Sequence, residues 1–311
     1  MGGRAQHLLS TGLQERCRGE LRTNEPLSAH TTFGMGGPAD LFFLPADGDD
    51  LQTALPLIRE SGLPVLPLGG GTNMLVRTPG FRGIVVDLTG GMKEIEIGVD
   101  QVVCQAGASL QVLSRRCQRE GRTGLEFGCG IPGTAGGAVR GNAGAFGGET
   151  LDRLSWLRGV LLDSGEEIRL QQADISYGYR YTALPSDVLI LEAGFRVEEA
   201  VPEAIRKEME DILSRRKATQ PLWERNAGCI FKNPPGTSAG LLIDQAGCKG
   251  LRVGQVEVSD VHANFTVNLG AGTPEDVLSV IERVREQVRQ HHGTELETEV
   301  RVVGEQGMEK R

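Results

Sequence analysis

The chain has 311 residues, of which 39% are hydrophobic and 24% charged, enough for a sizeable core shared by about two domains. Its formal net charge of −8 disfavours nonspecific binding to nucleic acid or to a membrane surface, because both are negatively charged. No apolar run approaches the ~18 residues of a membrane span, and the first residues contain no signal-peptide core. We therefore expect a cytoplasmic protein.

The first part of the chain predicts a small α/β unit that ends near residue 90. Residues 1–24 are polar and weakly patterned, which is typical of a short helix or a loose arm. Strands are expected at 41–45, 65–68 and 84–88. Between the first two, 48–62 predicts a helix, because its apolar residues recur at spacings of three and four and a glycine ends it.

The middle of the chain, from about 91 to 200, continues this alternation. A strand at 102–106 precedes a helix at 108–121. Two strands joined by Asp163-Ser164-Gly165 predict a hairpin over 154–170. Residues 187–197 are nearly all apolar and predict a buried strand.

The last part predicts three helices and two strands. The helices are expected at 201–221, 238–246 and 273–293, and the strands at 262–268 and 299–303. The helix at 273–293 has the strongest end signals: Thr273 as a cap, Pro274 at the first position and Gly293 as the stop.

Glycine is concentrated in two stretches. Residues 130–149 contain eight glycines, a density that disfavours the interior of a helix or strand, because each glycine there costs roughly 0.5–1 kcal/mol relative to alanine. The second stretch, 69–73, follows an apolar run. Glycine-rich loops bring backbone N–H groups close to anions, so two of them predict a ligand with an extended, phosphate-bearing skeleton. Neither loop has the Walker A lysine or a clean G-x-G-x-x-G that opens a helix, which disfavours an ordinary Rossmann site.

These loops stand in order with four further motifs. They are HTTFGMGGPAD (30–40), YGYRYT (177–182), NAGCIFKNP (226–234) and LETEVRVVG (296–304). Over roughly residues 25 to 304 the chain resembles the UDP-N-acetylenolpyruvoylglucosamine reductase family, also called UDP-N-acetylmuramate dehydrogenases. That family shares its FAD-binding fold with vanillyl-alcohol oxidase and p-cresol methylhydroxylase.

The resemblance implies an α+β fold built from two FAD-binding subdomains, at 25–90 and 91–200, and a substrate-binding domain at 201–304. An N-terminal arm, 1–24, and a tail, 305–311, flank them. It also implies that FAD binds non-covalently; the sequence leaves the oligomeric state open, and we expect a monomer. The residues expected to hold FAD are Gly69, Gly70, Gly71, Thr72, Asn73, Ile131, Pro132, Gly133, Thr134, Gly136, Gly137, Asn142 and Ala143.

The implied reaction reduces the enolpyruvyl ether of UDP-N-acetylglucosamine to UDP-N-acetylmuramate, a precursor of bacterial peptidoglycan. NADPH, the co-substrate, reduces the flavin and leaves before the UDP-sugar enters the same pocket. The modest chain length suggests the class without an additional substrate-clamping tyrosine loop.

Three residues are implied as catalytic. Arg180 on its own could simply cover neighbouring tyrosines. The resemblance implies instead that it binds the substrate carboxylate, for which a guanidinium fork is suited. Cys229 on its own reads as a small buried hydrophobe. In the family this position holds the proton donor, commonly serine, whereas a thiol with a pKa near 8.5 gives up its proton more readily. Glu297 and Glu299, two apart in an expected strand, would share a face, and motif alignment favours Glu299.

Substrate binding is expected from Tyr179, Lys217, Lys232 and Asn233. No metal site is expected, because the six cysteines form no C-x-x-C pair and suit a reduced, intracellular chain. We read His30 as structural, and His291 and His292 as interacting with the dipole of the helix that they end.

Two alternatives remain. A flavin oxidase of the wider fold, acting on an alcohol or sugar with oxygen, would leave NAGCIFKNP and LETEVR unexplained. A non-catalytic flavin-binding paralogue would be expected to have lost Arg180 or the glutamate, and the chain retains both.

Overall fold

The computed structural model describes residues 2–309, which form two compact units, each drawn from several stretches of chain. The first unit comprises the residues up to Thr23, Leu41–Gly70 and Gly83–Arg215. The second comprises Asn24–Asp40, Gly71–Arg82 and the residues from Arg216 onward. Helices and strands are mixed in both units, in agreement with the expected α+β class. The division into two flavin subdomains and a substrate domain stays a prediction.

The first unit is built on a five-stranded antiparallel sheet. Its strand order is β12 (Glu167–Gln171), β11 (Leu154–Leu161), β15 (Val188–Arg196), β7 (Gln101–Gln105) and β6 (Ile95–Ile97). The hairpin expected around Asp163-Ser164-Gly165 is confirmed as β11–β12, and the apolar stretch 187–197 as the buried strand β15. A further sheet has the order β1 (Glu20–Pro26), β2 (Pro38–Leu44), β5 (Phe81–Asp87) and β3 (Val65–Leu68).

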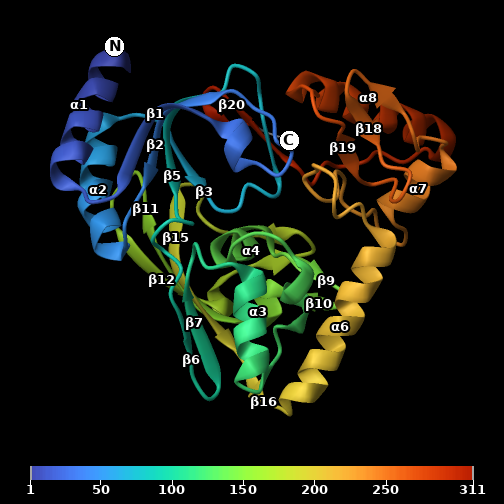
Figure 1. Ribbon diagram of the computed structural model, residues 1–311, viewed down its shortest axis with the longest axis horizontal. Coiled ribbons are helices and arrows are strands. Elements are labelled where there is room, and N and C mark those ends of the chain that lie inside the picture. Colours follow the sequence, from blue (N-terminus) through green and yellow to red (C-terminus); the bar gives the residue numbers. More distant parts are fainter. Residues whose placement is uncertain (1, 310–311) are drawn as a thin grey trace. The chain divides into compact units, whose positions relative to one another are not determined.

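Helices precede, separate and follow these strands along the chain. They are α1 (Gly2–Arg16), α2 (Gly48–Ser61), α3 (Leu110–Arg119), α4 (Ala135–Gly141), α5 (Thr150–Arg153) and α6 (Pro202–Thr219). In Figure 1, α1 and α2 lie side by side, and their buried residues Leu9, Leu13, Leu51 and Ile58 belong to one core with the strands. The expected helices at 48–62, 108–121 and 201–221 are confirmed.

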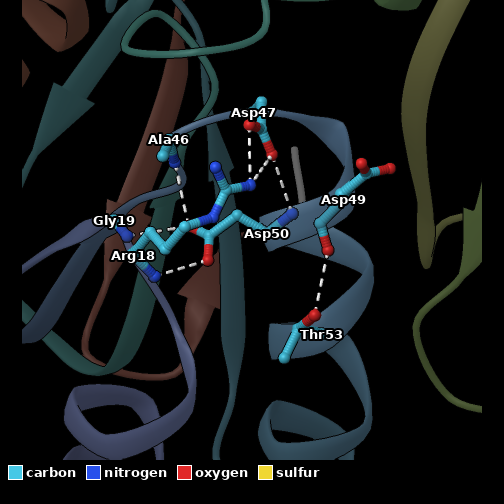
Figure 2. A network of polar contacts seen from close by, with 7 residues as sticks. All are labelled: Arg18, Gly19, Ala46, Asp47, Asp49, Asp50 and Thr53. Carbon is cyan, nitrogen blue, oxygen red and sulfur yellow. Dashed lines mark hydrogen bonds and ion pairs between the residues drawn. The ribbon is translucent and has the colours of Figure 1, made fainter.

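A network of polar contacts fixes the start of α2 (Figure 2). Asp47 caps the helix by accepting a hydrogen bond from the backbone N–H of Asp50, and it also pairs with Arg18 at 2.6 Å. The carboxylate of Asp50 is buried but accepts three backbone N–H groups, from Arg18 at 2.6 Å, Gly19 at 2.8 Å and Ala46 at 2.9 Å. A buried charge is tolerated there because donors surround it.

The glycine-rich segment 130–149 corrects one expectation. We expected neither helix nor strand, yet α4 occupies its centre and a short hairpin of β9 (Gly144–Ala145) and β10 (Gly148–Glu149) follows. Thr134 caps α4, and tertiary packing offsets the glycine penalty. At Gly136 a Cβ atom would lie 2.8 Å from the Cβ of Ala106, so only glycine allows this approach.

The second unit contains two three-stranded sheets and two helices. One sheet has the order β21 (Gly307–Met308), β20 (Arg301–Gly304) and β4 (Met74–Val76), and the other β17 (Arg252–Val253), β18 (Val256–Val258) and β19 (Thr266–Asn268). The helices are α7 (Ala239–Gln245) and α8 (Pro274–His292). Helix α8 packs against β17, β18 and α7 (Figure 1). The predicted ends of α8 are confirmed: Thr273 caps it and Gly293 terminates it with φ 67°.

Two expected strands are shorter than predicted. Only Thr266–Asn268 of 262–268 is strand, because Phe265 N–H donates to the carbonyl of His262 and closes a turn. Residues 297–299 precede β20, and so the two glutamates lie in extended chain before the strand.

The remaining elements are short. They are η1 (Leu27–His30), β8 (Arg122–Thr123), η2 (Glu126–Gly130), η3 (Gln172–Asp174), β13 (Tyr177–Gly178), β14 (Tyr181–Thr182) and β16 (Glu198–Glu199). Among residues 2–309, no helix combines the length and the apolar character needed to cross a membrane.

Candidate active site

The two glycine-rich stretches meet within the first unit. A Cβ atom on Gly69 would lie 2.4 Å from Oγ1 of Thr134, so the first stretch reaches the second only because residue 69 is glycine. The second stretch is anchored by backbone bonds: Leu110 N–H donates to Gly133 O, and Gly136 N–H donates to Ala106 O. These contacts give the loop a fixed course ahead of α4.

Arg180 lies at the turn of the short hairpin β13–β14. Its φ is +55°, a left-handed conformation that a non-glycine residue adopts only when its surroundings hold it there. The guanidinium donates from Nη2 to Gly144 O at 2.9 Å and lies 5.0 Å from the centre of the Tyr179 ring. The side chain of Arg180 is therefore directed back toward the glycine-rich segment.

Cys229 and Glu299 come together in the second unit. The stretch that begins at Cys229 runs antiparallel to the one that carries Glu299: Glu299 N–H donates to Ile230 O at 2.7 Å, and Phe231 lies opposite Thr298. Cys229 in turn lies opposite Phe265. Both side chains are half-buried, so backbone pairing sets a thiol and a carboxyl on adjacent extended segments that solutes can reach.

Asn73 joins the glycine stretch 71–73 to this pair. Its Nδ2 donates to Glu299 O at 3.2 Å, and its carbonyl accepts Arg301 N–H at 3.1 Å, at the start of the parallel pairing of β4 with β20. Gly71, with φ +59°, lies so close to His30 O that a Cβ atom would be only 1.9 Å away.

The other predicted substrate-binding residues differ in their surroundings. Lys232 is largely covered and forms an ion pair with Glu297, Nζ to Oε1 at 2.6 Å. Asn233 is exposed and accepts Ala239 N–H through Oδ1 at the start of α7. Lys217 is exposed on the last turn of α6, and Tyr179 is 43% exposed.

Comparison with known proteins identifies the family. The model of the UDP-N-acetylenolpyruvoylglucosamine reductase C-terminal domain matches residues 220–303, and an FAD-binding domain model matches 39–171. The UDP-N-acetylenolpyruvoylglucosamine reductase of Geobacter metallireducens is 42% identical over 94% of this chain and 97% of its own length. The enzyme of that name from Rubrobacter xylanophilus is also 42% identical, over 94% of this chain and 99% of its own. The chain belongs to the UDP-N-acetylenolpyruvoylglucosamine reductase family.

A solved structure of this reductase family supports the fold. The reductase of Thermus caldophilus superposes with a TM-score of 0.78 and 34% identity, covering 92% of this chain and 98% of that one. The α+β class with an FAD-binding domain and a reductase C-terminal domain is thereby confirmed.

The described residues suit the FAD that a reductase of this family requires. Oδ1 of Asn73 is buried and has no hydrogen-bond partner among residues 2–309, although Nδ2 of the same side chain is bonded. Buried acceptors are rarely left without a donor. The N–H or hydroxyl groups of a flavin nucleotide could donate a hydrogen bond to Oδ1, and so this acceptor fits the cofactor.

Sequence reasoning missed residues that hold the candidate site residues in position. Asn264 is buried, and its side chain binds both backbone polar groups of Phe231. Its Oδ1 accepts the N–H at 2.9 Å, and its Nδ2 donates to the carbonyl at 2.8 Å. The carbonyls of Gly144 and Val139 hold the Arg180 hairpin, accepting hydrogen bonds from the guanidinium of Arg180 and the hydroxyl of Thr182. These contacts join residues remote in sequence, so no local pattern marks them.

Proposed function

We propose that the chain reduces UDP-N-acetylglucosamine enolpyruvate to UDP-N-acetylmuramate in the bacterial cytoplasm, with non-covalently bound FAD and with NADPH as co-substrate. The observation that carries this proposal is the pairing of the Cys229 segment with the Glu299 segment, to which Asn73 of the glycine stretch is bonded. A proton donor, a carboxyl group and a flavin-binding loop are needed together for this reaction, and the second unit joins the three segments that we propose for these roles.

FAD, held by the glycine-rich stretches 69–73 and 130–143, would supply the hydride chemistry that links NADPH to the terminal carbon of the enolpyruvyl group. The chain's own residues must then stabilise negative charge on the substrate carboxylate and protonate the adjacent carbon. We propose that Arg180 stabilises this negative charge, because its fork of N–H donors matches a carboxylate. We assign Glu299 to the same group as a protonated carboxyl, because only that form donates a hydrogen bond.

Cys229 supplies the proton in this proposal. The S–H bond breaks as the new C–H bond forms, and the thiolate is reprotonated from solvent before the next turnover. The net change is therefore one hydride from NADPH and one proton from the thiol added across the double bond. Gly228, with φ +76°, precedes the thiol and lets the chain turn into the extended segment.

The uridine diphosphate requires cationic groups, because the chain as a whole is acidic. We propose the cations Lys217 and Lys232 for this role, with Asn233 and Tyr179 as neutral hydrogen-bonding groups for the same substrate. Lys232 would exchange its ion pair with Glu297 for the diphosphate when substrate binds.

Stopped-flow spectroscopy of the flavin tests the proposal through Cys229. The holoenzyme is reduced anaerobically with NADPH and then mixed with the enolpyruvyl substrate. We expect Cys229→Ala to leave reduction by NADPH unchanged and to slow reoxidation by about 10²–10⁴-fold, the usual contribution of a general acid. Cys229→Ser, which keeps a hydroxyl proton, should recover much of the rate.

Cys17 provides the matched control, because it is also a half-buried free thiol and lies in the first unit. Cys17→Ala should reoxidise at the wild-type rate. Equal reoxidation by wild type and Cys229→Ala would remove Cys229 from the mechanism. If NADPH does not reduce the bound flavin but an alcohol does, the result would instead favour a flavin oxidase.

A further inference from the structure

We propose that Asn142 is a positioning residue for Arg180: it fastens the Arg180 hairpin to the glycine-rich segment and so sets where the guanidinium points. The inference rests on the proposed role of Arg180 at the substrate carboxylate. It assigns to Asn142 a role distinct from the flavin contact expected from its motif.

The side chain of Asn142 is committed to the protein. It has no exposed surface, and its two N–H donors go to Glu149 Oε2 at 2.7 Å and to Gly178 O at 2.9 Å. Its Oδ1 accepts Leu151 N–H at 3.0 Å. Three of the four hydrogen bonds available to an asparagine amide are thus used within the first unit, and any contribution to flavin binding would come from its backbone.

The carbonyl that Asn142 binds is two residues from Arg180. Gly178 belongs to β13 and pairs with Tyr181 of β14, so Tyr179 and Arg180 form the turn between them. A fixed Gly178 carbonyl therefore fixes the base of a two-residue turn. Arg180 has φ +55° in that turn, a conformation that needs support from outside the hairpin.

A second tie holds the other strand of the hairpin. Oγ1 of Thr182 donates to Val139 O at 2.9 Å, which attaches β14 to α4 as Asn142 attaches β13 to the end of α4. The guanidinium of Arg180 itself donates to Gly144 O, two residues beyond Asn142. The hairpin is therefore held on both strands and at its turn by the segment 139–144.

Asn142 is itself in the left-handed region, with φ 42° and ψ 57°, where it caps the C-terminus of α4. Glycine adopts this conformation without strain, so Asn142→Gly removes the amide and preserves the backbone. Thr182→Val is a second variant, because it deletes only a hydroxyl and keeps the shape of the side chain.

The test separates three reactions of the holoenzyme: reduction of the oxidised form by NADPH, and reoxidation of the reduced form by the enolpyruvyl substrate or by dioxygen. Asn142→Gly should slow only reoxidation by substrate, by about 10–100-fold, because a misplacement near 1 Å costs up to that order. The loss should fall on kcat, and Thr182→Val should show the same pattern with a smaller effect. Asn24→Gly, also at a positive φ of 53° but exposed and in the second unit, should match wild type.

A double-mutant cycle with Arg180→Lys distinguishes positioning from general structure. If Asn142 acts through Arg180, adding Asn142→Gly to Arg180→Lys should slow substrate reoxidation little further. Additive losses in the double variant would overturn the inference. Equal slowing of all three reactions by Asn142→Gly and by Thr182→Val would overturn it as well. If Arg180→Lys is slow while Asn142→Gly and Thr182→Val are normal, the inference fails and the role of Arg180 stands. A normal Arg180→Lys would refute the role of Arg180 and the inference that depends on it.

Discussion

Glu297 and Glu299 are two residues apart, but the fold gives them different surroundings. Glu297 is exposed and forms an ion pair with Lys232. Glu299 is half-buried, and both its N–H and its carbonyl are bonded, to Ile230 and to the side chain of Asn73. The backbone of Glu299 is therefore fixed from both sides, next to the segment that carries Cys229.

This difference predicts opposite results for two matching substitutions. Glu299→Gln should slow reoxidation of reduced flavin by substrate by about 10²-fold, because an amide N–H donates a weaker hydrogen bond than a carboxylic acid O–H to the charge that develops on the substrate. Glu297→Gln should leave that rate unchanged and lower KM severalfold or less, because Lys232 no longer has to give up an ion pair, worth only ~0–1 kcal/mol, to bind the diphosphate. Stopped-flow traces and steady-state KM values for both variants test this. A slow Glu297→Gln beside a normal Glu299→Gln would reverse the assignment.

At the scale of single elements, the start of α2 depends on one buried carboxylate. Asp50 accepts three backbone N–H groups, two of them from Arg18 and Gly19, which are remote in sequence (Figure 2). Gly19 cannot carry a side chain, because a Cβ atom there would be 2.2 Å from Leu44 O. Helix cap, carboxylate and glycine thus form one structural unit.

Asp50→Asn should lower the free energy of unfolding by about 2–4 kcal/mol, because one carboxylate oxygen is lost and buried N–H groups remain unsatisfied. Asp49→Asn is the control: Asp49 is exposed in the same helical turn and would lose its interaction with the helix dipole, about 0.3–1 kcal/mol, and a weak attraction to Arg18. Denaturant unfolding of both variants provides the comparison. Equal losses would show that the charge at the helix terminus matters and the burial does not.

The same elements show what sequence can predict. Both ends of α8 and the end of α2 were predictable, because Thr273, Gly293 and Gly62 act within one turn of chain. Helix α4 was not, because the close contact that requires its Gly136 is with Ala106, thirty residues earlier in the chain. Likewise, the motifs identified Cys229 and Arg180 as candidates through family resemblance. The contacts of Asn264 and Asn142 that shape their surroundings depend on the folded chain.

Across the whole molecule, the six cysteines are free thiols in two environments. Cys17 and Cys229 are half-buried, whereas Cys104, Cys117, Cys129 and Cys248 are buried. Burial raises the pKa of Cys117 to about 12, with Glu126 adding to the effect, and raises the pKa of Cys104 still further. In the unfolded chain a thiol has a pKa near 8.5.

Stability should therefore fall at alkaline pH. Between about pH 8.5 and 12 the unfolded chain has lost the protons of Cys104 and Cys117 while the folded chain retains them, so rising pH favours unfolding. Each thiol contributes a slope of about 1.4 kcal/mol per pH unit in this window. A Cys104→Ala/Cys117→Ala variant, measured under reducing conditions at pH 7 to 10, should show a shallower decline above pH 8.5 than wild type. Parallel curves above pH 8.5 would contradict this explanation.

The interleaved construction of the second unit has a consequence for biosynthesis. Phe33, Met35 and Leu75 belong to one core with Ile230 and Val300, and β4 pairs in parallel with β20. During translation, these early apolar residues cannot complete their core until more than two hundred later residues have been synthesised. At bacterial elongation rates this takes on the order of ten seconds or more. The five-stranded sheet of the first unit needs only residues 95–196 and can form within that time. The nascent chain therefore exposes Phe33, Met35 and Leu75 until translation is nearly complete, which makes this interval the stage most dependent on chaperones.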